Sequence, residues 1–251
     1  MTLLTEATEV FAPADTGGRW VVAFLVRRQK VAAGAFGARE QAAIADVLRA
    51  FAQEGWRLSV RAMFDPSLGA EAAAYDTGFA HAVDFAGAFE APSLAAGLAG
   101  TIRLERAGWS RRFATEWLLG PREFATVGAD AAASGHDWGF LALWEWNDAW
   151  AAATAQQRRD YDQDCDVAFA GDLALGIAIA GRHRLDWASS WHHLGVWEAA
   201  SPAVIDAAMR GHERADDFRF TTSRHLIGRR RTLADLIAAD GGAPNPNGGG
   251  P

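Results

Sequence analysis

Histidine is the side chain in this sequence best able to take or give a proton near neutral pH, and its distribution is uneven. Of the seven histidines, only His81 lies in the first half of the chain. Seven of the eleven tryptophans also fall in the second half. We therefore expect the second half to carry the functional site and the first half to complete the core. The second-half histidines are His136, His183, His192, His193, His212 and His225.

Two predicted strands bring some of these histidines within reach of one another. Side chains alternate between the two faces of a strand. In residues 191–198, His193 shares a face with two tryptophans, and in residues 218–228, His225 shares a face with two hydroxyl residues. The face partners are Trp191, Gly195 and Trp197 for His193, and Thr221 and Ser223 for His225.

A third predicted strand, residues 176–185, ends in charged residues that could complete a catalytic cluster. His193 or His225 would act as the acid or base, and Asp186 would orient it. Arg184 or Arg224 would stabilise an oxyanion. The alternative for each histidine is a structural role, in which the imidazole is satisfied by hydrogen bonds. Both interpretations stay open from the sequence.

Eleven tryptophans against two tyrosines is the strongest bias in composition. Tryptophan supplies a large flat apolar face with one N–H donor. It could fill a core left loose by small alanines, or it could line a pocket for a planar aromatic ligand. For such a pocket we expect Trp144, Trp191 and Trp197, with His192 and His183 beside them.

Motifs for bound metals and nucleotides are missing. His192 and His193 are adjacent, so in a strand they point to opposite faces and do not share an ion. HxH, HExxH and CxxC spacings are absent, and we predict no metal site. No glycine-rich loop or GxSxG elbow has the required context. We expect no tightly bound cofactor, with reduced flavin as a diffusible co-substrate compatible with the sequence.

Composition narrows the partners. The net charge of −7 and the pI near 5.5 provide no basic stripe for phosphates, so we expect no nucleic acid. No apolar run reaches the length of a membrane span, and no signal peptide is evident. We therefore expect no membrane partner and a cytoplasmic location. Cys165 is the single cysteine, which excludes an internal disulfide.

The elements that must position these residues occur twice. Each half reads as strand, helix, strand, strand, helix, strand, and the halves close on Leu-Leu-Gly at Gly120 and Leu-Ile-Gly at Gly228. This order is the split βαβ, or ferredoxin-like, unit. We predict an α+β fold with tandem ferredoxin-like repeats at residues 19–126 and 136–240, and a disordered tail at 241–251. Residues 57–64 alternate and are expected to form a strand.

This layout resembles the dimeric α/β-barrel superfamily, fused in tandem so that one chain forms the barrel. The resemblance covers most of residues 20–230 and rests on the element order and the repeat. More narrowly, the size and the tryptophan-rich second half are similar to angucycline ring-opening oxygenases of jadomycin- and gilvocarcin-type pathways. That resemblance implies a metal-free oxygenase of aromatic polyketide biosynthesis, which uses O2 to cleave or rearrange a polycyclic quinone or hydroquinone.

Under this resemblance the residues take specific roles. Trp144, Trp191 and Trp197 would hold the flat ring system, and His193 or His225 would remove a phenolic proton. Arg184 or Arg224 would stabilise the resulting oxyanion, and Asp186 would orient the histidine. The partner is a planar polycyclic small molecule, and a homodimer is compatible with the sequence.

Three alternatives remain open. Some dimeric α/β-barrel proteins bind haem through one helical histidine, and His212 is the candidate here, because it falls near the apolar face of its predicted helix. A cofactor-free isomerase or cyclase would use the same acid and base without oxygen. A binding protein for a planar natural product would show no turnover, since a fold alone does not fix a function.

Overall fold

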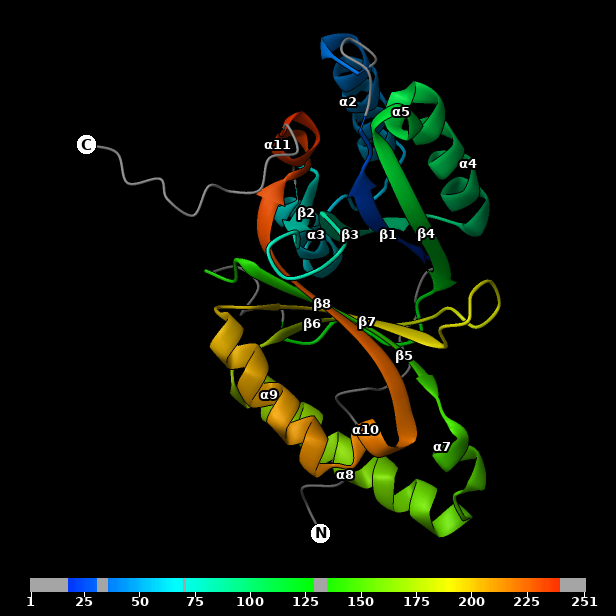
Figure 1. The fold of residues 1–251 in the computed structure, drawn as a ribbon, viewed down its shortest axis with the longest axis vertical. Coiled ribbons are helices and arrows are strands. Elements are labelled where there is room, and N and C mark those ends of the chain that lie inside the picture. The colour runs from blue at the N-terminus through cyan, green and yellow to red at the C-terminus, as the bar shows by residue number, and fades with distance from the viewer. Residues whose placement is uncertain (1–17, 31–35, 70, 129–134, 240–251) are drawn as a thin grey trace, which may run out of the picture.

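The computed structural model describes residues 18–30, 36–69, 71–128 and 135–239. They form an antiparallel sheet of eight strands in the order β4-β1-β3-β2-β8-β5-β7-β6 (Figure 1). The first four come from the first half of the chain and the last four from the second, each in ferredoxin-like order. The strands are β1 (Trp20–Arg28), β2 (Ala73–Asp76), β3 (Phe85–Ala91), β4 (Phe113–Pro121), β5 (Trp138–Trp146), β6 (Ala178–Arg184), β7 (His193–Ala199) and β8 (Thr221–Thr232).

Helices follow the strands in the alternation that the repeat predicts, so the α+β fold class is confirmed. Residues 241–251, expected to form a tail, lie outside the described residues. The helical elements are α2 (Ala38–Gln53), α3 (Val60–Phe64), η1 (Pro66–Leu68), α4 (Leu94–Leu104), η2 (Glu105–Trp109), α5 (Ser110–Arg112), α7 (Asp148–Ala152), α8 (Ala155–Ala174), α9 (Pro202–Arg214), α10 (Asp217–Phe220) and α11 (Leu233–Ala238).

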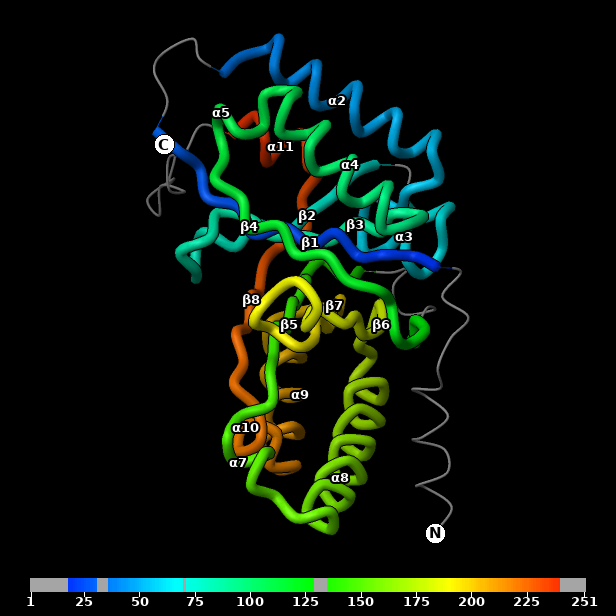
Figure 2. Tube along the Cα trace, turned by 90° about the vertical axis from the view of Figure 1, so that its right-hand side faces the viewer, coloured from blue at the N-terminus to red at the C-terminus, as the bar shows by residue number. Residues whose placement is uncertain are grey.

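The layers are helices, half-sheet, half-sheet, helices. Helices α2 and α4 cover the outer face of the first half-sheet, and α8 and α9 cover the outer face of the second (Figures 1 and 2). The inner faces pack on each other through small and branched apolar side chains from both halves. Examples are Ala23 and Leu25 on β1, and Leu141 and Leu143 on β5. Neither half could bury this face alone.

The closed intrachain barrel that we expected is not confirmed, because the sheet is open. Regular pairing joins the halves on one side, between β2 and β8. On the other side β4 and β6 end the strand order, and among the residues that the structure describes two isolated bridges cross, Arg122–His183 and Val127–Ile179. A Cβ on Gly228 would lie 2.7 Å from the Asp76 carbonyl, and one on Gly120 would collide with the Arg184 carbonyl. The repeated glycine thus marks where backbone of the other half comes close.

Residues 57–64 do not form the strand that their alternation predicts. Arg57 makes one bridge to Glu90, and α3 begins directly afterwards. The Ser59 side chain accepts the backbone N–H of Ala62 and caps this helix. Val60 and Ala62 are buried in both interpretations, so the apolar alternation did not distinguish a strand from a short helix.

The space between helices and sheet in the first half is filled by aromatic rings. Phe24 packs on Phe89 at 4.8 Å and on Trp117 at 5.9 Å between ring centroids. Trp109 is fully buried beside them, and its indole N–H donates to Thr115. Helix α11 also packs on this cluster, so the end of the second repeat stabilises the first half.

Replacing Trp109 by Ala should lower the free energy of unfolding by about 3–5 kcal/mol, because a large ring leaves a cavity in a packed cluster. Trp187 is 44% exposed, and its replacement by Ala should cost about 1 kcal/mol. Urea unfolding of both variants measures the difference. Equal losses would contradict a close-packed first half.

Candidate functional site

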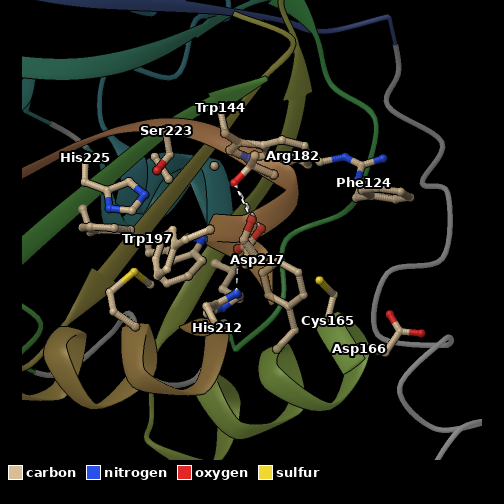
Figure 3. Close-up of a pocket in the computed structure, with 18 of the residues that line it drawn as sticks. Phe124, Trp144, Cys165, Asp166, Arg182, Trp197, His212, Asp217, Ser223 and His225 are labelled. Atoms are coloured by element: carbon tan, nitrogen blue, oxygen red, sulfur yellow. Dashed lines mark hydrogen bonds and ion pairs between the residues drawn. The ribbon is translucent and has the colours of Figure 1, made fainter. Parts of the chain in front are cut away.

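The outer face of the second half-sheet is hollow where that of the first is filled. A cavity of about 240 Å3 lies between this half-sheet and helices α8 and α9 (Figure 3). The two halves pair their strands in the same register: Trp20 faces Ala91 and Pro121, and Trp138 faces Ala199 and Arg229. Each first-half position therefore has a second-half equivalent.

This equivalence explains the cavity. Three large rings of the first half have smaller or polar side chains as their counterparts, so the matching volume is empty. Phe24, Trp117 and Phe113 correspond to Ala142, His225 and Thr221. The floor is flat because Ala142 and Gly195 are small, and Trp144 and Trp197 form walls. Strand alternation delivers Thr221, Ser223 and His225 to the cavity and turns Leu226 to the inner core.

His225 is the neutral imidazole of the cavity. Its ring lies 5.0 Å from Phe140 and 5.8 Å from Phe218, and no described residue hydrogen-bonds it. Burial lowers the pKa of His225, opposed by the charge of Asp217. A neutral imidazole keeps one nitrogen lone pair, which can accept a proton or bind a metal ion.

His212 also lines the cavity, but its ring is fully engaged. Nε2 lies 2.9 Å from Asp172 Oδ2, and Nδ1 lies 3.2 Å from Asp217 Oδ2. Burial would lower the pKa of His212, but the two carboxylates win and raise it to about 9. The Tyr161 hydroxyl donates to the other oxygen of Asp217 at 2.6 Å. His212 is thus an imidazolium held by two carboxylates, with no lone pair to offer.

Of the other residues predicted for the pocket, some lie at the cavity and others lie away from it. Trp144 lines the cavity, and His193 stacks on it with 4.1 Å between ring centroids. Burial, followed by the charge of Arg182, lowers the pKa of His193 to about 3. Trp191, in contrast, precedes β7 and packs against the inner core. His192 accepts the backbone N–H of Trp146.

The predicted cluster of acid, base and oxyanion partner does not form. Arg184 and Asp186 pair with each other at 2.6 Å in a half-exposed position, and Asp186 makes no hydrogen bond to a histidine. Arg224 lies on the face of β8 opposite His225 and reaches Glu116 of the first half at 3.3 Å. His183 is fully buried on the inner face of the sheet.

Arg182 is the arginine that reaches the cavity, and our prediction chose its neighbour Arg184 instead. Its guanidinium lies over the Phe124 ring at 4.2 Å and near the Trp144 ring at 5.8 Å, and its Nε donates to Glu123 at 2.8 Å (Figure 3). Alternation within β6 was the signal that could have found it, because Arg182 and Arg184 share a face, and Arg184 is the last residue of the strand while Arg182 lies opposite Gly195 of the cavity floor.

No group of three or more His, Cys, Asp or Glu side chains is placed to hold a metal ion among the described residues. In the same ranges, no helix has the length and apolar character that spanning a bilayer requires.

No protein-family model and no curated protein matches this chain. Solved structures do match. A tryptophan-to-valine variant of the chlorite dismutase from Candidatus Nitrospira defluvii has a TM-score of 0.65 at 9% identity, covering 88% of this chain and 94% of that one. The same enzyme with imidazole gives 0.63 at 12%, covering 89% and 95%. A provisionally named chlorite dismutase, TA0507, gives 0.63 at 10%, covering 87% and 97%.

These similarities show the fold alone: the chain is folded like chlorite dismutase-like proteins, which are themselves members of the dimeric α/β-barrel superfamily. They give no support to the angucycline oxygenases. Chlorite dismutases are haem proteins, so our expectation of no tightly bound cofactor, with diffusible flavin, is wrong on this comparison.

The residues of the cavity can be tested against a haem. His212 does not fit as an iron ligand, because both ring nitrogens are held by carboxylates. His225 fits, because its neutral imidazole faces the cavity, and haem iron is commonly bound by one histidine. Ala142 and Gly195 leave a flat floor, which larger side chains would fill. The cavity of about 240 Å3 is below the roughly 300–1,000 Å3 of ligand pockets, so a haem would fit only with displacement of lining side chains.

The His212 ion network should make stability depend on pH. The folded pKa of about 9 exceeds the unfolded value of about 6.5. Its stabilisation is therefore complete below pH 6.5 and is lost as pH rises through 9, amounting to about 3 kcal/mol. Urea unfolding of the wild type and His212→Gln at pH 6, 7.5 and 9.5 should show a difference that shrinks with pH. A difference that stays constant would contradict a charged His212, and His192→Gln serves as the control.

Proposed function

We propose that this protein is a haem-binding oxidoreductase of the dimeric α/β-barrel superfamily, and that the haem occupies the cavity of the second half. The observation that carries the proposal is the neutral, unpaired His225 in an aromatic cavity that the first half lacks. The fold similarity to chlorite dismutases supports it. His225, rather than His212, is the proposed axial ligand.

The chain's own residues would divide the work. Trp144 and Trp197 would contact the faces and edge of the flat ring, and Gly195 would allow its close approach to the sheet. Arg182 would hold an anionic group at the rim, with Glu123 fixing its guanidinium. When bound, haem supplies one-electron and oxygen chemistry, and the protein contributes binding, orientation and electrostatics.

Chlorite is the first substrate to test, because the structural neighbours are named for its dismutation. Nothing in the comparisons favours an aromatic polyketide.

A homodimer remains a prediction, to be measured by light scattering of the loaded protein. A binding protein without turnover differs from this proposal by showing haem uptake but no reaction.

His225→Ala should weaken haem binding about 10-fold or more, because a metal–ligand bond is lost. Hemin is titrated into the purified protein, and the absorption band near ~400 nm is followed. His192→Ala is the matched control, since His192 only caps a backbone N–H outside the cavity. Equal binding and an unchanged band in His225→Ala would refute His225 as the ligand, and absence of any band in the wild type would refute haem binding.

Arg182→Ala should lower kcat/KM for chlorite about 10- to 100-fold, because a hydrogen bond to a charged partner contributes about 1.5–3 kcal/mol. Oxygen release by the haem-loaded protein measures the rate. Arg184→Ala is the matched control, as this residue lies two positions away, is half-exposed and pairs only with Asp186. Similar losses in both variants would show that general surface charge, rather than Arg182, acts on the substrate.

A further inference from the structure

Each half of the molecule buries one glutamate at the same position of the repeat. Glu90 pairs with Val21 across β1, and Glu198 pairs with Gly139 across β5, near the end of β3 and β7. Both are on the inner face of the sheet, at 0% and 1% exposure. A buried carboxylate is tolerated only with compensating cations and hydrogen bonds. Because Glu90 and Glu198 occupy equivalent positions, the charged groups around them can be compared directly.

The surroundings of Glu198 are balanced in charge. Arg61 Nε lies 3.1 Å from its carboxylate and Arg230 Nε lies 3.9 Å away, while the Tyr75 hydroxyl donates to it at 2.7 Å. Arg61 also pairs with Asp137 at 3.2 Å. Two guanidinium groups thus meet two carboxylates.

The surroundings of Glu90 are not balanced. Arg122 Nε lies 2.6 Å from the carboxylate, Arg57 Nη1 lies 2.8 Å away and Arg19 Nε lies 4.0 Å away. Among the described residues, no second carboxylate lies within ion-pair distance of these three arginines. Burial, with repulsion from Arg57 next, lowers the pKa of Arg19. Three positive charges therefore meet one negative charge.

Buried donors in this cluster lack partners. Arg122 Nη2 and Arg57 Nε are buried without a hydrogen bond, and the Arg122 side chain is only 5% exposed. His183 lies directly opposite Arg122 in an antiparallel bridge, so the two side chains share one face. His183 is fully buried, and neither ring nitrogen has a hydrogen-bond partner. Buried donors are nearly always satisfied by protein groups, water or a ligand, so these atoms can receive an acceptor from outside the chain.

We propose that Arg19, Arg57 and Arg122 bind a small inorganic anion at this junction of the two halves. The anion would supply the negative charge that Asp137 supplies in the balanced cluster, and the guanidinium forks suit a planar oxyanion such as nitrate. Arg19 and Arg57 are 27% and 24% exposed, so the cluster can be reached from solvent. The site lies on the inner face of the sheet, opposite the cavity, and does not depend on haem.

Thermal unfolding in sodium nitrate tests this proposal with the full chain. Ionic strength is kept constant with sodium gluconate, whose anion is much bulkier than nitrate, while nitrate rises from 0 to ~20 mM. A bound anion stabilises the folded state by mass action. For a chain of this length, nitrate at about five times its Kd should raise Tm by about 2–4 °C.

Two arginine variants separate the cluster from general salt effects. Arg19→Gln removes one positive charge at a partly exposed position and should abolish the nitrate-dependent rise in Tm, whatever its own starting Tm. Arg103→Gln, which loses an exposed pair with Glu54 and a contact with the Phe51 ring but removes no charge from the Glu90 cluster, should keep the rise. The proposal fails if nitrate and gluconate give the same Tm in the wild type, or if Arg19→Gln responds to nitrate as fully as Arg103→Gln does.

Discussion

The apolar interior between the two half-sheets constrains the location of every reactive group. Since the inner faces of both halves must pack on each other, a carboxylate buried there needs counter-charges, as Glu198 has in Arg61 and Arg230. The aromatic cavity lies instead on the outer face of the second half-sheet, beneath α8 and α9. Strand alternation enforces the division residue by residue: His225 faces outward, and its neighbour Leu226 faces inward.

Among the described residues, the aromatic cavity lies on the outer face of one half, because the repeat differs in side-chain volume while keeping its backbone register. The Phe24–Trp117 ring contact of the first half becomes Ala142 opposite His225 in the second. The exchange removes two large rings and introduces a polar one. The first half has kept its volume and stabilises the sheet, and it also receives α11 from the far end of the chain. The filled core and the open cavity thus lie in different copies of the same unit.

The sequence pattern predicted the features that depend on local periodicity, such as the order of the elements and the facing of strand residues. It missed side-chain contacts between residues far apart in the chain. The element order, the second-half location of the polar groups and the facing of β8 follow from alternation and the repeat. Trp191 was misplaced because β7 begins two residues later, at His193. The partner of Arg224 is Glu116, 108 positions earlier in the chain, and no spacing rule relates them. For residues 57–64, a strand and the observed capped helix both bury Val60 and Ala62, and the helix buries Met63 as well.

His212 and His225 show how the cavity separates two groups of identical chemistry. Both rings line it, yet two carboxylates fix a proton on His212, whereas burial among aromatic rings keeps His225 neutral. The imidazolium of His212 lowers the pKa of His225 further, so each state reinforces the other. Environments that drive like groups to opposite protonation states are the usual means of assigning distinct roles. The sequence predicted His212 as the haem ligand because it lies on the apolar face of a helix. In the structure the same face places Asp172 and Asp217 against both ring nitrogens of His212. The free base is His225, which the first half replaces with Trp117.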